Sequence, residues 1–344
     1  MEKTRLGRTG LMVTRTAFGV LPLQRVPLPE AVPILRRAYE AGINFYDTAR
    51  GYTDSEEKIG AALADVRDHI VIATKSGAKN RQKLLADLET SLRHLRTDHV
   101  DILQLHNPAQ LPDPDDPEST YAGLLEARAK GMVRFLGFTN HRRSAAEQAI
   151  ASGLYDTIQF PLCMISPPED LALVDACRQA DLGLIAMKAL SGGLITNARA
   201  AFAFLRQFEN LVPIWGIQRP AELEEFLALD AAPPALDAAM RAVIEADRRA
   251  LQGDFCRGCG YCLPCPAEIP IPMAARMSLL LRRLPAARFL DDEWAASMGR
   301  IDNCIDCGHC KAHCPYGLDT PELLRRNLAD YRTFRPTIPT GGSK

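Results

Sequence analysis

The 344-residue sequence lacks three features that each mark a particular class of protein. It has no excess of charge, since 41 Lys and Arg nearly balance 42 Asp and Glu, which gives no support to nucleic acid or an anionic membrane as the main partner. No run approaches the roughly 18 apolar residues of a membrane span. The N-terminus, MEKTRLGRTG, has no apolar core of a secretory signal. We therefore expect a cytoplasmic protein with neither a nucleic-acid nor a membrane partner.

The first two-thirds of the chain repeats one rhythm of a short apolar run, a turn and an amphipathic helix. Strands are expected at 16–20, 44–48, 70–75, 101–106, 134–139, 157–160, 182–188 and 211–217. Helices are expected between them, for example at 30–41, 82–94, 119–130 and 168–180. Short apolar strands alternating with helices imply parallel pairing, and eight units predict an α/β fold, a closed (β/α)8 TIM barrel. An open doubly wound sheet is the alternative, but no G-x-G-x-x-G motif opens the first helix.

Eight of the ten cysteines fall into two runs near the C-terminus. The runs are Cys256, Cys259, Cys262 and Cys265, and then Cys304, Cys307, Cys310 and Cys314. The second run has the spacing of bacterial ferredoxins with two [4Fe–4S] clusters, and the first departs from it by one spacer residue. Because such ferredoxins exchange the fourth ligand between runs, Cys314 should complete the cluster of the first run and Cys265 that of the second. Two four-cysteine zinc sites are the alternative.

The composition changes after Asp230, which sets the expected domain boundaries. We expect the barrel at 1–230, preceded within it by a hairpin at 4–15, and a helical linker at 231–255. A small, mostly helical ferredoxin-like domain should follow at 256–334, with one good helix near 273–284 and another at 321–331. The Pro- and Gly-containing tail, 335–344, reads as a flexible end.

Titratable and polar residues stand at the ends of three consecutive expected strands. Asp47 closes the second strand with Tyr52 in the loop after it, Lys75 ends the third, and His106 ends the fourth. Catalytic groups of barrel enzymes collect at these strand ends. The set suits carbonyl reduction by hydride, in which Tyr52 delivers a proton, Lys75 beside it stabilises the phenolate, Asp47 balances Lys75, and His106 orients the carbonyl.

With these residues in place, the chain resembles the aldo/keto reductase family. The matching stretches are GINFYDTARGYTDSE, VIATKSG, DILQLHNP, FLGFTN, DTIQFP and LIAMKALSGG. The resemblance implies that Asp47, Tyr52, Lys75 and His106 form the family's catalytic tetrad, with Tyr52 the acid/base. Together with the C-terminal CRGCGYCLPCP, the chain resembles a ferredoxin-fused branch of that family.

The resemblance also implies a nicotinamide cofactor, NADP or NAD. The implied contacts are Gly19, Thr139, Asn140, Gln159, Lys188, Leu190, Gly192, Trp215, Gly216, Gln218 and Glu222. Three positions depart from the family pattern. Thr139 replaces a Ser, Leu162 stands where a Tyr stacks on the nicotinamide ring, and Gln218 occupies the position that often binds the 2′-phosphate. The choice between NADP and NAD is therefore open.

Three interpretations of the fusion remain. In the first, the barrel reduces a small-molecule carbonyl or oxidises an alcohol, and two [4Fe–4S] clusters connect it to an external one-electron redox partner. A flavin would normally stand between hydride and one-electron chemistry. The sequence contains no flavin motif, but a barrel mouth could hold a flavin without a local signature. In the second, the clusters are structural. In the third, the barrel is a non-catalytic cofactor-sensing or electron-carrier module, against which the intact tetrad argues.

Overall fold

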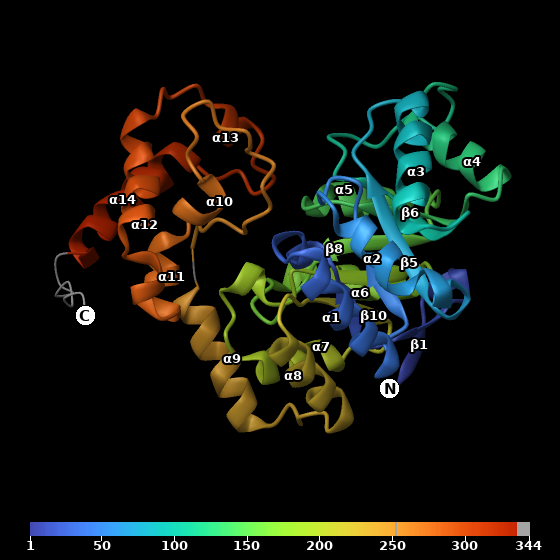
Figure 1. The fold of residues 1–344 in the computed structure, drawn as a ribbon, viewed down its shortest axis with the longest axis horizontal. Coiled ribbons are helices and arrows are strands. Elements are labelled where there is room, and N and C mark those ends of the chain that lie inside the picture. Colours follow the sequence, from blue (N-terminus) through green and yellow to red (C-terminus); the bar gives the residue numbers. More distant parts are fainter. Residues whose placement is uncertain (252, 336–344) are drawn as a thin grey trace. The chain divides into compact units, whose positions relative to one another are not determined.

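The computed structural model describes residues 1–251 and 253–335 (Figure 1). Contacts between Cα atoms divide the chain into two compact units. The first contains Met1–Ala189 and Asn197–Glu245, and the second contains Leu190–Thr196 and the chain from Ala246 onward. Among the described residues no helix is long and apolar enough to cross a membrane.

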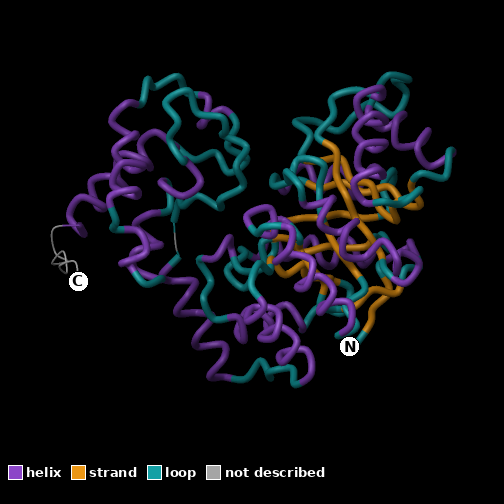
Figure 2. Tube along the Cα trace, viewed as in Figure 1, coloured by secondary structure: helices purple, strands orange, loops and turns teal. Residues whose placement is uncertain are grey.

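The first unit contains a closed barrel of eight parallel strands, which confirms the predicted fold and excludes the open sheet. The strands are β3 Ala17–Gly19, β4 Phe45–Asp47, β5 Val71–Ser76, β6 Val100–His106, β7 Val133–Thr139, β8 Thr157–Pro161, β9 Gly183–Met187 and β10 Leu211–Gly216. β10 closes the ring by pairing with both β9 and β3. Figure 2 shows the strands in orange with the helices of this unit around them.

Helices alternate with the strands as the sequence pattern requires. They are α1 Leu28–Glu40, α2 Ser55–Leu63, α3 Arg81–Leu95, α4 Thr120–Ala129, α5 Arg143–Ser152, α6 Pro168–Gln179, α7 Ala198–Arg206 and α8 Pro220–Ala231. Several begin at a side-chain cap that satisfies a free backbone N–H of the first turn. Asn80 accepts from the N–H of Lys83 at the start of α3, and Ser119 accepts from that of Ala122 at the start of α4.

A two-stranded hairpin precedes the barrel. Its strands, β1 Lys3–Arg5 and β2 Met12–Thr14, are antiparallel, and Gly10 takes the left-handed conformation in the turn. Leu6 and Val13 of this hairpin join Phe45, Ile102 and other inward-facing strand residues in one buried apolar cluster. The hairpin is therefore part of the barrel's core, covering the end opposite to the carboxyl ends of the strands.

The second unit is helical. Its elements include α10 Ile271–Ala274, α11 Met277–Arg283, α12 Asp292–Gly299, α13 His309–Ala312 and α14 Thr320–Phe334. The single helix expected near 273–284 is wrong in one respect, because the chain is broken at Arg276 into α10 and α11. The guanidinium of Arg276 donates to the carbonyls of Pro272 and Gly192, which ties the break to the segment Leu190–Thr196. α12 was not expected at all.

The division by contacts does not fall where the composition changes. Helix α9, Ala238–Ala250, lies within the expected linker, and its residues up to Glu245 group with the barrel. Leu190–Thr196, expected in the barrel, group with the helical unit, where the carbonyl of Leu194 accepts from Arg283. Apart from Arg335, the expected flexible tail lies outside the described residues.

The hairpin gives a test of the barrel core. Leu6 is 1% exposed, whereas Met12 on the same hairpin is 51% exposed. We expect Leu6→Ala to lower the free energy of unfolding by about 2–5 kcal/mol, because it leaves a cavity in the apolar cluster. Met12→Ala is the matched control and should change it by less than about 0.5 kcal/mol. Urea unfolding of both variants checks this, and equal effects would show that the hairpin is not part of the core.

Candidate active site and cluster pockets

The interior of the barrel is built in two layers. Successive residues of a strand face opposite sides, so every second residue points inward. The inward residues nearest the hairpin are apolar, among them Ala17, Phe45, Ala73 and Ile102. The next inward residues toward the carboxyl ends are polar on three of these strands: Asp47, Lys75 and Gln104. The sequence thus places a buried polar layer on top of an apolar one.

A buried ion pair lies at the centre of the polar layer. The Nζ atom of Lys75 is 2.5 Å from Oδ1 of Asp47 and 2.6 Å from the carbonyl oxygen of Thr48. The side chains are 1% and 3% exposed, so both charges are removed from water. Burial raises the pKa of Asp47 and lowers the pKa of Lys75, while their mutual attraction and hydrogen bond oppose both shifts.

Tyr52 and His106 lie next to this pair. The Nζ atom of Lys75 is 5.3 Å from the centroid of the Tyr52 ring. The rings of Tyr52 and His106 meet edge to face, with centroids 5.7 Å apart and planes at 83°. Burial, together with the charges of Lys75 and Lys188, lowers the pKa of His106 to about 3. The structure therefore brings all four predicted tetrad residues together, with a neutral imidazole at pH 7.

Two further partners of the ion pair were not expected from the sequence. Gln104 donates to Oδ2 of Asp47 at 3.1 Å, and Gln159, expected only at the cofactor, donates to Oδ1 at 3.3 Å. The signal for Gln104 was its position two residues before His106, which places both on the inward face of one apolar strand. His141 was also missed: it is buried, and burial with the nearby Lys188 and His106 lowers its pKa well below the usual value.

Not all of the predicted nicotinamide contacts lie at the carboxyl ends of the barrel strands. Most stand at the carboxyl ends of the barrel strands or in the adjoining turns: Gly19, Thr139, Asn140, Gln159, Lys188, Gly216 and Gln218. Trp215 faces outward, its indole stacked between the rings of Phe202 and Phe226. The carboxylate of Glu222 accepts from the backbone N–H groups of Gln218 and Arg219 and so caps α8. Leu190 and Gly192 belong to the second unit.

One buried hydrogen-bond acceptor at the barrel mouth, on Gln159, receives no hydrogen bond from the described residues. The Oε1 atom of Gln159 lacks a hydrogen-bond partner within the part of the chain that the structure describes. The Asn140 amide beside it makes two hydrogen bonds within the chain: its Nδ2 donates to the carbonyl of Pro108, and its Oδ1 accepts from the backbone N–H of Arg142. A buried, unpaired acceptor on a side chain already fixed by Asp47 suits a ligand N–H, such as that of a carboxamide.

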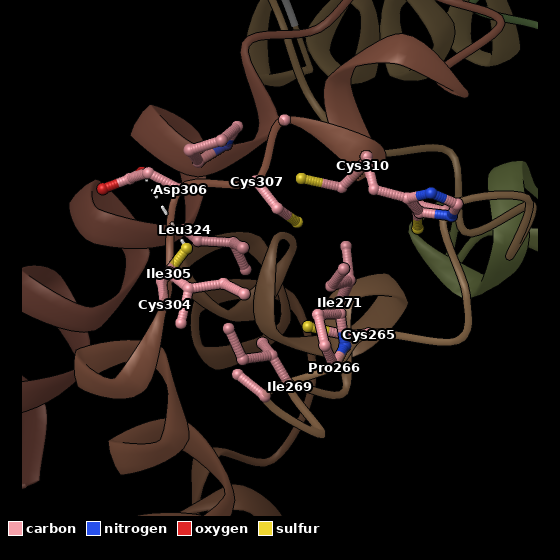
Figure 3. A pocket seen from close by; sticks show the side chains of 15 residues that line it. Cys265, Pro266, Ile269, Ile271, Cys304, Ile305, Asp306, Cys307, Cys310 and Leu324 are labelled. Atoms are coloured by element: carbon pink, nitrogen blue, oxygen red, sulfur yellow. Dashed lines mark hydrogen bonds between the residues drawn. The ribbon is translucent and has the colours of Figure 1, made fainter.

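The cysteines of the second unit line two pockets. One, of about 390 Å³, is lined by Cys265 of the first run and by Cys304, Cys307 and Cys310 of the second. In Figure 3 these four side chains surround the same space. The apolar residues Ile269, Ile271 and Leu324 also line it.

The other pocket, of about 350 Å³, is lined mainly by cysteines of the first run. It is lined by Cys256, Cys259 and Cys262 of the first run and by Cys314 of the second. Cys262 and Cys310 contribute to both pockets. Each pocket is thus lined by three cysteines of one run and two of the other, and each expected set of four ligands lies within one of these linings.

Two family models match the chain. Residues 15–228 match the aldo/keto reductase family, and residues 255–319 match a 4Fe-4S dicluster domain. The first match covers the barrel strands and every tetrad residue. The second covers both cysteine runs and supports iron–sulfur clusters over the zinc alternative.

Individual relatives match the barrel region. The aldo-keto reductase YhdN of Bacillus subtilis is 26% identical over 217 residues, covering 57% of this chain and 64% of that protein. The methylglyoxal reductase DkgB of Salmonella typhimurium is 34% identical over 160 residues, covering 45% and 59%. The chain thus spans less than two thirds of the length of these two relatives.

A solved structure shows the same fold. The aldo-keto reductase of Klebsiella pneumoniae in complex with NADPH superposes with a TM-score of 0.62 over 71% of this chain and 94% of that one, at 21% identity.

The neutral His106 predicts how stability depends on pH. Its folded pKa of about 3 lies below the usual 6.5, so the unfolded chain binds a proton that the folded chain does not, and stability falls as pH falls through that window. We expect His106→Gln to gain about 1.5 kcal/mol relative to the wild type between pH 6.5 and pH 5.

Urea unfolding of both proteins at the two pH values measures this gain. His69→Gln, at an exposed position of the same unit, is the matched control and should show none. An identical pH dependence in His106→Gln and the wild type would mean that His106 is protonated in the folded chain.

Proposed function

The chain belongs to the aldo/keto reductase family and carries a C-terminal 4Fe-4S dicluster domain, and on that premise we propose that its barrel reduces small-molecule carbonyl compounds with NAD(P)H. The observation that carries the proposal is the tetrad geometry, with Lys75 bound to Asp47 and facing the ring of Tyr52. The relative DkgB is a methylglyoxal reductase, which makes a small aldehyde a reasonable first substrate.

Tyr52 is the proton donor in this proposal. A carbonyl oxygen that receives hydride on its carbon becomes an alkoxide and needs a proton. An ordinary phenol has a pKa of about 10 and is a poor acid at neutral pH. The ammonium of Lys75 favours the phenolate, which makes proton release from Tyr52 easier. His106, neutral because of its lowered pKa, donates a hydrogen bond that orients the carbonyl without carrying a charge of its own.

A nicotinamide would supply the hydride when bound. The residues that would hold its carboxamide are Thr139, Asn140 and Gln159, at the ends of neighbouring strands. The unpaired Oε1 of Gln159 supports this assignment, since a carboxamide N–H would satisfy it. The choice between NADP and NAD, and the contacts to the phosphates, are not assigned.

The second unit, in the same proposal, holds two [4Fe–4S] clusters. The residues that would bind one are Cys256, Cys259, Cys262 and Cys314; for the other they are Cys265, Cys304, Cys307 and Cys310. The lining of the two pockets supports these sets. The clusters would pass single electrons to a redox partner, while the barrel handles electron pairs. Clusters with a purely structural role are the second candidate, which this mismatch in electron number favours.

The proton-donor assignment predicts a clean separation of turnover from binding. Tyr52→Phe should lower the kcat for NADPH- or NADH-dependent reduction of methylglyoxal or 4-nitrobenzaldehyde by about 10²–10⁴-fold, because the proton donor is lost. Its affinity for the nicotinamide, measured by fluorescence titration, should stay within about twofold of the wild type. Tyr39→Phe, which removes a phenol on α1, is the matched control. Unimpaired turnover in Tyr52→Phe would reject the assignment.

The pocket linings predict how cysteine variants combine. Cys265→Ala should lose about half of the iron and sulfide of the anaerobically purified protein, because one of two clusters loses a ligand. Adding Cys304→Ala, from the same set, should cost little more. Adding Cys256→Ala, from the other set, should remove nearly all the remaining iron. If the pair Cys265→Ala and Cys256→Ala keeps half of its iron, each run binds its own cluster and the exchange is wrong.

A further inference from the structure

The Asp47 carboxylate is buried deeply enough that each of its hydrogen bonds matters. It is 2% exposed, and a buried ion is stable only if its lone pairs are satisfied. Oδ1 accepts from Lys75 and Gln159. Oδ2 accepts from Nε2 of Gln104 at 3.1 Å, the only donor to this oxygen that the described residues supply.

Gln104 is fully buried in the barrel interior, and its side chain makes one hydrogen bond among the described residues, to Asp47. It lies in β6 two residues before His106, on the same inward face, and is 0% exposed. A Cβ atom on Gly137 of the neighbouring strand β7 would come within 2.6 Å of its Cγ, so only a glycine there leaves room for the glutamine. Its Oε1 has no hydrogen-bond partner within the described residues. A polar side chain with one unpaired end is costly in a barrel core, and its other end contacts the ion pair.

We propose that Gln104 is a positioning residue of the tetrad: by donating to the outer oxygen of Asp47 it keeps the carboxylate ionised and Lys75 an ammonium beneath Tyr52. The inference rests on the proposed carbonyl reduction and extends it by one residue that acts through Asp47. The hydrogen bond that Gln104 donates goes to Asp47.

The charges around Lys75 and Asp47 determine whether loss of Gln104 raises or lowers the pH at which Tyr52 ionises. Those that act on it or on its neighbours are Glu56, which favours the charged form of Lys75, and Lys188, which opposes charging of His106. Neither donates to Oδ2 of Asp47. If Gln104 is lost, that oxygen is uncompensated. Either it draws the proton from Lys75 or its negative charge acts unbalanced, and in both cases the phenolate of Tyr52 is less stable. Tyr52 then keeps its proton to higher pH.

The test compares two buried variants in the full, cluster-loaded chain. Gln104→Met preserves length and volume but removes the donor. Reduction of 4-nitrobenzaldehyde needs protonated Tyr52, so the pH at which kcat/KM falls on the alkaline side should rise by about one unit. Thr157→Val is the matched control: its hydroxyl is buried, lacks a partner among the described residues, and also lies against Gly137. It should leave this limb where it is.

A second readout does not need turnover. The signal of Tyr52 in protein labelled at the tyrosine Cζ carbon, assigned by its absence from Tyr52→Phe, reports ionisation of the phenol directly by NMR. It should shift to higher pH in Gln104→Met alone. An unshifted titration, or an equal shift in Thr157→Val, would overturn the role of Gln104. A wild type that turns over no carbonyl, with the NMR shift present, would reject the proposed function and leave this inference standing.

Discussion

The buried ion pair between Lys75 and Asp47 is the interaction on which the barrel site depends. Two charges are removed from water on neighbouring strands, a costly arrangement that is tolerated only with close geometry and further donors. The 2.5 Å contact provides the geometry, the two glutamine amides donate to Asp47, and the Thr48 carbonyl accepts from Lys75. In return, an ammonium is fixed under the ring of Tyr52, where a solvated lysine would be mobile and screened. The rigid parallel strands hold the arrangement, since each member comes from a strand end or the turn beside it.

The second unit works by a different principle. It has an apolar core of its own, which includes Met277, Leu280 and Leu324, and the thiols of its two cysteine runs line two pockets. Burial raises the pKa of Cys262 to about 12, so this thiol would not ionise on its own. An iron–sulfur cluster supplies positive iron that binds the thiolate and reverses that preference. Cluster binding would therefore be coupled to deprotonation of this thiol.

Much of this was predictable from sequence, for physical reasons. All eight strands were expected within two residues of their bounds, because short apolar runs that alternate with helices are typical of buried parallel strands. The proximity of Asp47, Tyr52, Lys75 and His106 was predictable because strand ends of a barrel converge. The inward direction of Gln104 follows from alternation along β6, but its hydrogen bond to Asp47 and the outward direction of Trp215 depend on the register of the closed barrel. The break at Arg276 was not predictable, because it depends on hydrogen bonds to Gly192, far away in sequence.

The central claim is that Lys75 and Asp47 act as one unit on Tyr52, and a double-mutant cycle tests it most directly. The measurement is kcat/KM for aldehyde reduction by Lys75→Met, Asp47→Asn and the two combined. Each single change should lower it by about 10²-fold or more, and the double variant should be no worse than the poorer single one, because residues that act as a unit are non-additive. Losses that multiply in the double variant would contradict the account.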